Sequence, residues 1–148
     1  MERILPLDFK EFLSLLHKRE VEYLVIGGYA VAYHGYPRLA PDIDIWMTGN
    51  TVNAERMVEV LVAFGFDRAA LSPSLFLQDK NFVQLGTPPL CIKIFTAISG
   101  VSFDECYAER TMEIIDAVEV NFIGLKHLKI NKKASGSYKG LNDLENLP

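Results

Sequence analysis

The chain has 148 residues, of which 49% are hydrophobic and 23% are charged, and its formal net charge is −4. This length and balance suit one globular domain with its own core and exclude a disordered chain. The acidic net charge argues against bulk nucleic-acid binding by a uniformly basic surface, and the apolar runs are too short to span a bilayer.

The N-terminal stretch MERILPLDF lacks the apolar core of a secretory signal. Cys91 and Cys106 are the two cysteines, and neither belongs to a metal-binding motif. We therefore expect a cytoplasmic protein with two reduced thiols and no membrane partner.

The first half of the chain predicts alternating helices and strands. Apolar residues repeat at helical spacing after Asp8, and a helix-cap signal at Asn50 or Thr51 opens a periodic segment that stops at Gly65. The predicted elements are a helix over 8–19, a strand over 23–26, a brief helix over 29–34, a strand over 42–47 and a helix between the cap at Asn50 or Thr51 and the stop at Gly65.

The second half begins with an ambiguous stretch, 66–80. The elements predicted after it are hairpin strands over 82–85 and 90–96, a helix from the capping box at Ser102 to about Arg110, strands over 112–115 and 117–122, a helix over 124–134 and a short helix over 141–147. We expect one α+β domain over 1–148, with a mixed sheet framed by helices and a lysine-rich C-terminal helical segment at about 124–148.

That C-terminal segment is basic on an otherwise acidic chain. From residue 121 onward, five lysines stand against Asp143 and Glu145. A solvated helix face explains such a segment, and so does a site for a polyanionic ligand; the sequence leaves both open.

The predicted strand over 42–47 contains two acidic residues among apolar ones. Asp42 and Asp44 alternate with Ile43 and Ile45, which places both carboxylates on one face about 7 Å apart. A solvated sheet edge is the simple reading. The functional reading is a divalent-metal site, because Mg²⁺ takes one or two carboxylates together with substrate phosphates. Gly27-Gly28, at a strand-to-helix turn, favours the second, since backbone without side chains lets phosphate approach closely.

Two other chemistries that use an Asp-x-Asp pair fit less well. Aspartyl phosphatases of the haloacid-dehalogenase type want Thr or Val two places after the second aspartate, where this chain has Trp46. Glycosyltransferases with this motif usually need a larger domain.

The stretches GGYAVAYHGYPRLAPDIDIW, KIFTAISGVSFDECY and FIGLKHLKINKKASGSYKGLNDLENL together resemble the DNA polymerase β-like nucleotidyltransferase superfamily. The similarity is to its small bacterial members, akin to AbiEii-type toxins and minimal nucleotidyltransferases. It covers most of the chain and implies a nucleotidyltransferase fold with an NTP as ligand. It implies that Asp42 and Asp44 bind Mg²⁺ or Mn²⁺, and that the phosphates contact Gly27, Gly28, Arg38, Lys132 and Lys133.

The same resemblance implies a third acid in the segment CIKIFT, where this chain has Lys93. An ammonium there is a cation in the place of a cation ligand, and we expect it to pair with Asp42 or Asp44. Two hypotheses follow. One is an enzyme that transfers a nucleoside monophosphate to a hydroxyl acceptor, weakened at Lys93. The other is a catalytically silent nucleotide- or partner-binding protein, such as one component of a toxin–antitoxin pair. The acceptor, the preferred base and the oligomeric state stay open.

Overall fold

The computed structural model describes residues 7–37, 42–78, 82–87 and 90–148. Within them, six strands form one mixed sheet with the order β3-β4-β2-β1-β6-β5. The strands are β1 (Tyr23–Ile26), β2 (Asp42–Met47), β3 (Phe82–Thr87), β4 (Leu90–Phe95), β5 (Thr111–Ile115) and β6 (Val118–Phe122). The helices are α1 (Leu7–Lys18), α2 (Gly27–Tyr33), α3 (Thr51–Phe64), α4 (Phe103–Ala108), α5 (Leu125–Ser135) and α6 (Tyr138–Asn146), with 3₁₀ turns η1 (Arg68–Ala70) and η2 (Pro73–Phe76).

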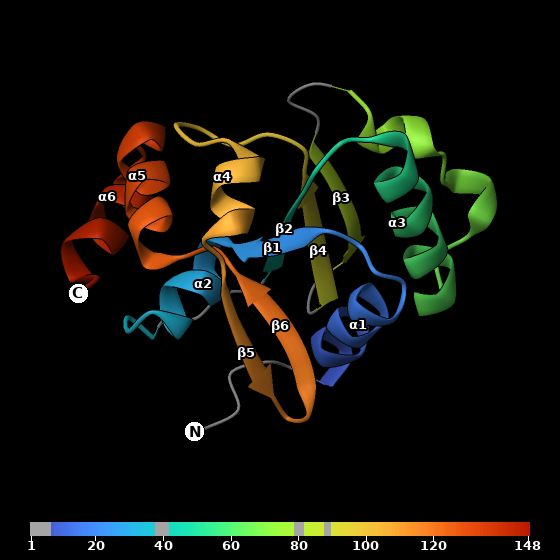
Figure 1. The fold of residues 1–148 in the computed structure, drawn as a ribbon, viewed down its shortest axis with the longest axis horizontal. Helices are drawn as coiled ribbons and strands as arrows, with labels where there is room; N and C mark the ends of the chain where they lie inside the picture. The colour runs from blue at the N-terminus through green and yellow to red at the C-terminus, as the bar shows by residue number, and fades with distance from the viewer. Residues whose placement is uncertain (1–6, 38–41, 79–81, 88–89) are drawn as a thin grey trace.

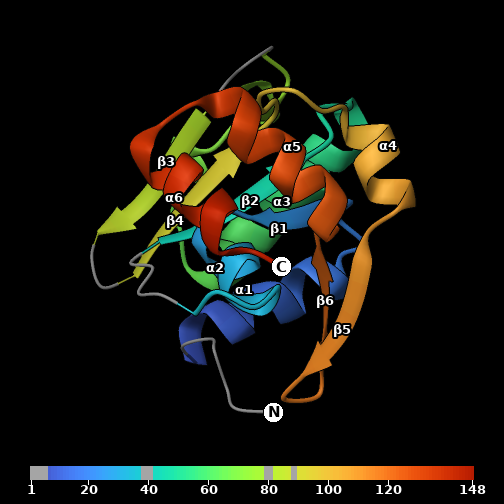
Figure 2. The same ribbon diagram turned by 90° about the vertical axis from the view of Figure 1, so that its left-hand side faces the viewer.

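The helices lie on both sides of the sheet. Figure 1 shows α1 and α3 on one side and α4, α5 and α6 on the other. In Figure 2 α5 and α6 lie in front of the central strands, and β3 emerges beside them. The largest fully buried side chains include Phe9, Phe12, Tyr23, Ile43, Ile45, Trp46, Phe76 and Phe122. No helix of the described part of the chain is long and apolar enough to cross a membrane.

The strand pairing explains how distant segments meet. β2 runs antiparallel to β1, so its first residues lie beside the last residues of β1, with Asp44 opposite Ile26. β2 also runs parallel to β4, with Asp44 opposite Lys93. The chain turns into α2 directly after Ile26, which brings the Gly27-Gly28 pair to the same end of the sheet.

The predicted α+β domain with a mixed sheet is confirmed, and the differences concern element ends. Asn50 caps α3 by accepting a hydrogen bond from the backbone N–H of Asn53, and Gly65 follows its last turn, both as predicted. α2 begins at Gly27 instead of residue 29. The ambiguous stretch 66–80 contains η1 and η2, and α6 begins at Tyr138, earlier than expected.

One predicted cap is wrong in its detail. Ser102 precedes α4, but its side chain accepts no cap hydrogen bond from the described residues. At α6, by contrast, Ser137 accepts a hydrogen bond from the backbone N–H of Gly140 and fixes the start of the helix. Of these two serines, Ser137 is therefore the one whose hydroxyl acts as an N-terminal cap.

Candidate active site: a carboxylate cleft beside Gly27

Asp42 and Asp44 share one face of β2, and we call the group that they form with Gly27, Gly28 and Lys93 the carboxylate cleft. The partly exposed side chains of the two acids alternate with Ile43 and Ile45, which are fully buried against the opposite layer. The predicted arrangement of the two carboxylates is therefore present. Strand alternation produces it, because the apolar residues take the core side and leave the acids on the side of α5 and α6.

Gly27 lies against the Asp44 carboxylate. Its φ of +68° is in the left-handed region, and a Cβ added there would lie 2.3 Å from Oδ2 of Asp44. Any other residue would be strained and would also strike the carboxylate. The backbone of the strand-to-helix turn and the acid of the next strand thus meet without an intervening side chain.

Asp44 is the more perturbed of the two acids. Its pKa is raised to about 6, mainly by burial; the charge of Lys93 lowers it, the charge of Asp42 raises it, and the charges of Lys132 and Lys139 lower it. Its Oδ1 atom is buried and has no hydrogen-bond partner among the described residues. A buried acceptor without a donor is costly, so this oxygen is suited to a cation or to a donor supplied by a ligand.

Lys93 pairs with the other acid. Its Nζ lies 3.0 Å from Oδ2 of Asp42, and the hydrogen bond to this carboxylate raises the pKa of Lys93. The ion pair expected from the sequence is confirmed. The thiol of Cys91, which is buried on the same strand, also faces Asp42, whose charge adds to burial in raising the thiol pKa.

The donors present suit one divalent ion better than two. Among the described residues, no group of three or more His, Cys, Asp or Glu side chains could hold a metal. Asp42 already has the Lys93 ammonium, whereas Asp44 keeps one oxygen without a partner in the described chain. An ion bound through Asp44 and substrate phosphates fits this set, and a second ion would have to displace the ammonium.

Two further lysines approach the cleft from the C-terminal helices. Lys132 of α5 lies 3.2 Å from Oδ2 of Asp143 on α6, and the two side chains are 13% and 1% exposed. The charges of Lys132 and Lys139 both act on Asp44. Lys133, which was also predicted to contact phosphate, is exposed on α5, and its role stays a prediction. Lys139 was not predicted as a site residue, yet its charge acts on Asp44.

Gly28 and Arg38 are the other residues predicted to contact phosphate. Gly28 follows Gly27 in the first turn of α2, so the pair stays together at the cleft. Arg38 lies outside the described residues. No sequence signal singles out Lys139, whose charge reaches the site because α6 packs on α5.

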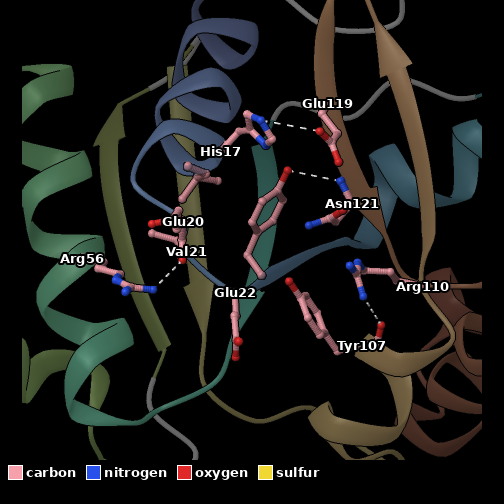
Figure 3. A pocket seen from close by; sticks show the side chains of 11 residues that line it. His17, Glu20, Val21, Glu22, Arg56, Tyr107, Arg110, Glu119 and Asn121 are labelled. Atoms are coloured by element: carbon pink, nitrogen blue, oxygen red, sulfur yellow. Dashed lines mark hydrogen bonds and ion pairs between the residues drawn. The ribbon is translucent and has the colours of Figure 1, made fainter.

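A hollow of about 350 Å³ lies away from these residues, at the opposite end of β1 (Figure 3). There the hydroxyl of Tyr23 accepts a hydrogen bond from the backbone N–H of Asn121, and the Arg110 guanidinium lies over the Tyr107 ring. Its ionisable lining residues include three acids, Glu20, Glu22 and Glu119, and three basic groups, His17, Arg56 and Arg110. This balanced charge suits a triphosphate less well than the lysines of the carboxylate cleft.

Comparison with solved structures supports the fold. A crystal structure of a candidate nucleotidyltransferase from Thermotoga maritima superimposes with a TM-score of 0.58, covering 93% of this chain and 84% of the other at 16% identity. No protein-family model matches the sequence, and a search of curated proteins finds no match. At this identity the likeness extends to the fold alone: the chain has a nucleotidyltransferase fold.

Proposed function

We propose that this chain, with its nucleotidyltransferase fold, binds a nucleoside triphosphate with one Mg²⁺ or Mn²⁺ in the carboxylate cleft. We propose further that it transfers the nucleoside monophosphate to a hydroxyl acceptor slowly. The observation that carries the proposal is the position of the Lys93 ammonium, 3.0 Å from Asp42 and opposite Asp44 in the strand register.

Binding is supported by three features of the cleft. Gly27 presents its backbone directly against Asp44, Lys132 and Lys139 supply positive charge, and Asp44 keeps a buried oxygen without a partner in the described chain. Asp44 would hold the metal ion, which neutralises phosphate charge when bound. Lys132, Lys139 and the Gly27-Gly28 backbone would then orient the triphosphate.

We expect transfer to be slow because Lys93 has no carboxylate that could accept a proton from the attacking hydroxyl. In the enzymes that this chain resembles, a third acid helps to activate the attacking hydroxyl. An ammonium whose pKa is raised by Asp42 stays protonated and accepts no proton from a hydroxyl. Lys93 therefore stabilises the pair of carboxylates, Asp42 and Asp44, without providing a general base.

A second function is favoured by the same residue. If transfer is absent altogether, the cleft serves a nucleotide- or partner-binding protein, as in one component of a toxin–antitoxin pair. The Lys93–Asp42 ion pair favours this alternative, because it stabilises a cleft that has lost its third acid.

The test is calorimetric titration of Mg·ATP into the wild type and into Asp42→Asn/Asp44→Asn, with Glu59→Gln/Asp67→Asn as a control that removes two acids outside the cleft. We expect binding to be lost only in the first double variant. Equal binding by all three proteins would contradict the proposed site. A labelled-NTP assay then separates slow transfer from none.

A further inference from the structure

Phe82 is a large aromatic side chain on the open edge of the sheet. It is 47% exposed, although most aromatic side chains of the described chain are at least partly buried. It begins β3, the terminal strand of the sheet. Its ring stacks on that of Phe95 in β4, with centroids 5.0 Å apart and planes inclined by 21°. Phe95 therefore holds the Phe82 ring in place from the side of the sheet.

The strand register places this ring on the face that carries the carboxylates. Phe82 lies opposite Phe95, and Phe95 lies opposite Trp46 of β2. Directly opposed residues project from the same face, so Phe82 and Trp46 share a face. Asp44 lies two residues before Trp46 on β2 and projects from that same face, so the Phe82 ring and the Asp44 carboxylate belong to one surface. Two strand spacings across the sheet and two residues along β2 separate Phe82 from Asp44, which amounts to about 12 Å between their Cα atoms.

Lys93 connects the ring to the cleft. Its ammonium lies 5.7 Å from the centroid of the Phe82 ring and 3.0 Å from Oδ2 of Asp42. A cation over an aromatic ring is an attractive arrangement that restrains both partners. The apolar ring thus adjoins the Lys93–Asp42 ion pair, on the strand face that carries Asp44.

We infer that Phe82 is the stacking platform for the base of the nucleotide whose phosphates bind in the carboxylate cleft. This inference rests on the proposed function. A nucleobase has a flat π-face, and an exposed aromatic ring held by a second ring is the partner that such a face prefers. The separation of about 12 Å leaves room for the sugar between the base and the phosphates. Stacking alone selects for a planar base and discriminates weakly among bases.

The experiment compares two ligands that differ in the base. Mg·ATP and Mg·tripolyphosphate are titrated into the wild type, Phe82→Ala, Phe82→Leu and Phe82→Trp. Stacking on an aromatic side chain corresponds to about a 5- to 150-fold change in affinity. We expect Phe82→Ala and Phe82→Leu to lose ATP affinity by a factor in this range and to keep tripolyphosphate affinity. Phe82→Trp should retain both.

Ile114→Ala is the matched control, because Ile114 is 69% exposed on β5, the strand at the other edge of the sheet. It should change neither affinity. Thermal melting of each variant, read by circular dichroism, confirms that it is folded at the titration temperature. Phe82→Leu keeps an apolar side chain on the strand and preserves the test if Phe82→Ala does not fold.

Two results would overturn the stacking platform and leave the proposed function standing. One is ATP affinity unchanged in both Phe82→Ala and Phe82→Leu. The other is an equal loss for ATP and tripolyphosphate, which would mean that Phe82 acts only by positioning Lys93. A wild type that binds neither ligand would overturn the proposed function and the platform together.

Discussion

The Lys93 ammonium and the Asp42 carboxylate lie 3.0 Å apart on neighbouring parallel strands, with Lys93 opposite Asp44 in the register. Two carboxylates on one strand face repel each other, and a cation between them removes much of that repulsion. In a metal-binding acid cluster a cation from solution supplies the compensating positive charge. Here the Lys93 ammonium supplies it. We therefore expect the two acids to need no bound cation to stay together in the folded chain.

Exchanging this lysine for an acid should make the cleft dependent on metal. In Lys93→Asp three carboxylates meet, and we expect the free energy of unfolding in EDTA to fall by about 1–3 kcal/mol. Mg²⁺ should restore much of the loss, and nucleotide transfer should rise, since a missing base typically costs about a hundred- to ten-thousand-fold in rate. Urea unfolding with and without Mg²⁺ measures the first effect. Lys93→Met, which removes the ammonium without adding a ligand, should show no rescue by metal.

Asp44 should make the protein less stable as the pH rises through its titration. Its pKa is about 6 in the folded chain against an ordinary value of 3.8, so the folded state binds more protons between these values. Stability then falls as pH rises from about 4 to 6, by on the order of 2–3 kcal/mol from this group. Asp44→Asn removes this contribution. Its stability relative to the wild type should therefore increase between about pH 4 and pH 7 in urea unfolding, and a constant difference would contradict the assignment.

Gly27→Ala should destabilise the protein more than Gly136→Ala, although the two glycines have nearly the same backbone conformation. Gly27 and Gly136 have φ values of +68° and +66°, but an added Cβ meets a described atom within 4 Å only at Gly27, where the Asp44 carboxylate would lie 2.3 Å away. Gly136→Ala should cost about 1 kcal/mol, the penalty for the left-handed backbone. Gly27→Ala should cost at least twice as much and should weaken Mg·ATP binding. Equal losses of stability in the two variants would mean that the turn relaxes freely away from Asp44.

Lys132 and Lys133 are adjacent in sequence and should behave differently. Lys132 is paired with Asp143, whose side chain is 1% exposed, whereas Lys133 is exposed. Removing the ammonium from a buried carboxylate is costly, so Lys132→Met should lower the free energy of unfolding by about 3 kcal/mol. Lys133→Met should change it by less than about 0.5 kcal/mol. Thermal unfolding of both variants measures the difference, and similar melting temperatures would refute the structural role of Lys132.

The sequence predicts most of this fold because its local signals agree with the tertiary structure. The alternation of Asp42 and Asp44 with buried isoleucines fixes the face of β2, and Gly65 ends α3 where expected. The pairing of Lys93 was predictable because the resemblance assigned its strand to the cleft. The role of each predicted site residue stays a prediction.

Other features depend on contacts that sequence spacing does not reveal. In the sequence Phe82 is one of several aromatic residues in predicted strands, and only the strand order shows that β3 lies at the edge of the sheet. Lys139 could not be told from the other lysines before α6 was seen to pack on α5. The same packing pairs Lys132 with Asp143, and a lysine-rich helix alone gives no indication of which lysine is buried.

The parallel pairing of β2 with β4 has a consequence for assembly. Asp42 and Lys93 belong to strands that α3, both 3₁₀ turns and β3 separate along the chain. Long-range pairing of this kind requires the intervening segment to close a loop, and we expect it to form after the local helices and hairpins. Until then the two acids have no counter-charge from β4. A ligand that requires this cleft would therefore recognise only chains in which β4 has paired with β2, and its binding would report that the central sheet is complete.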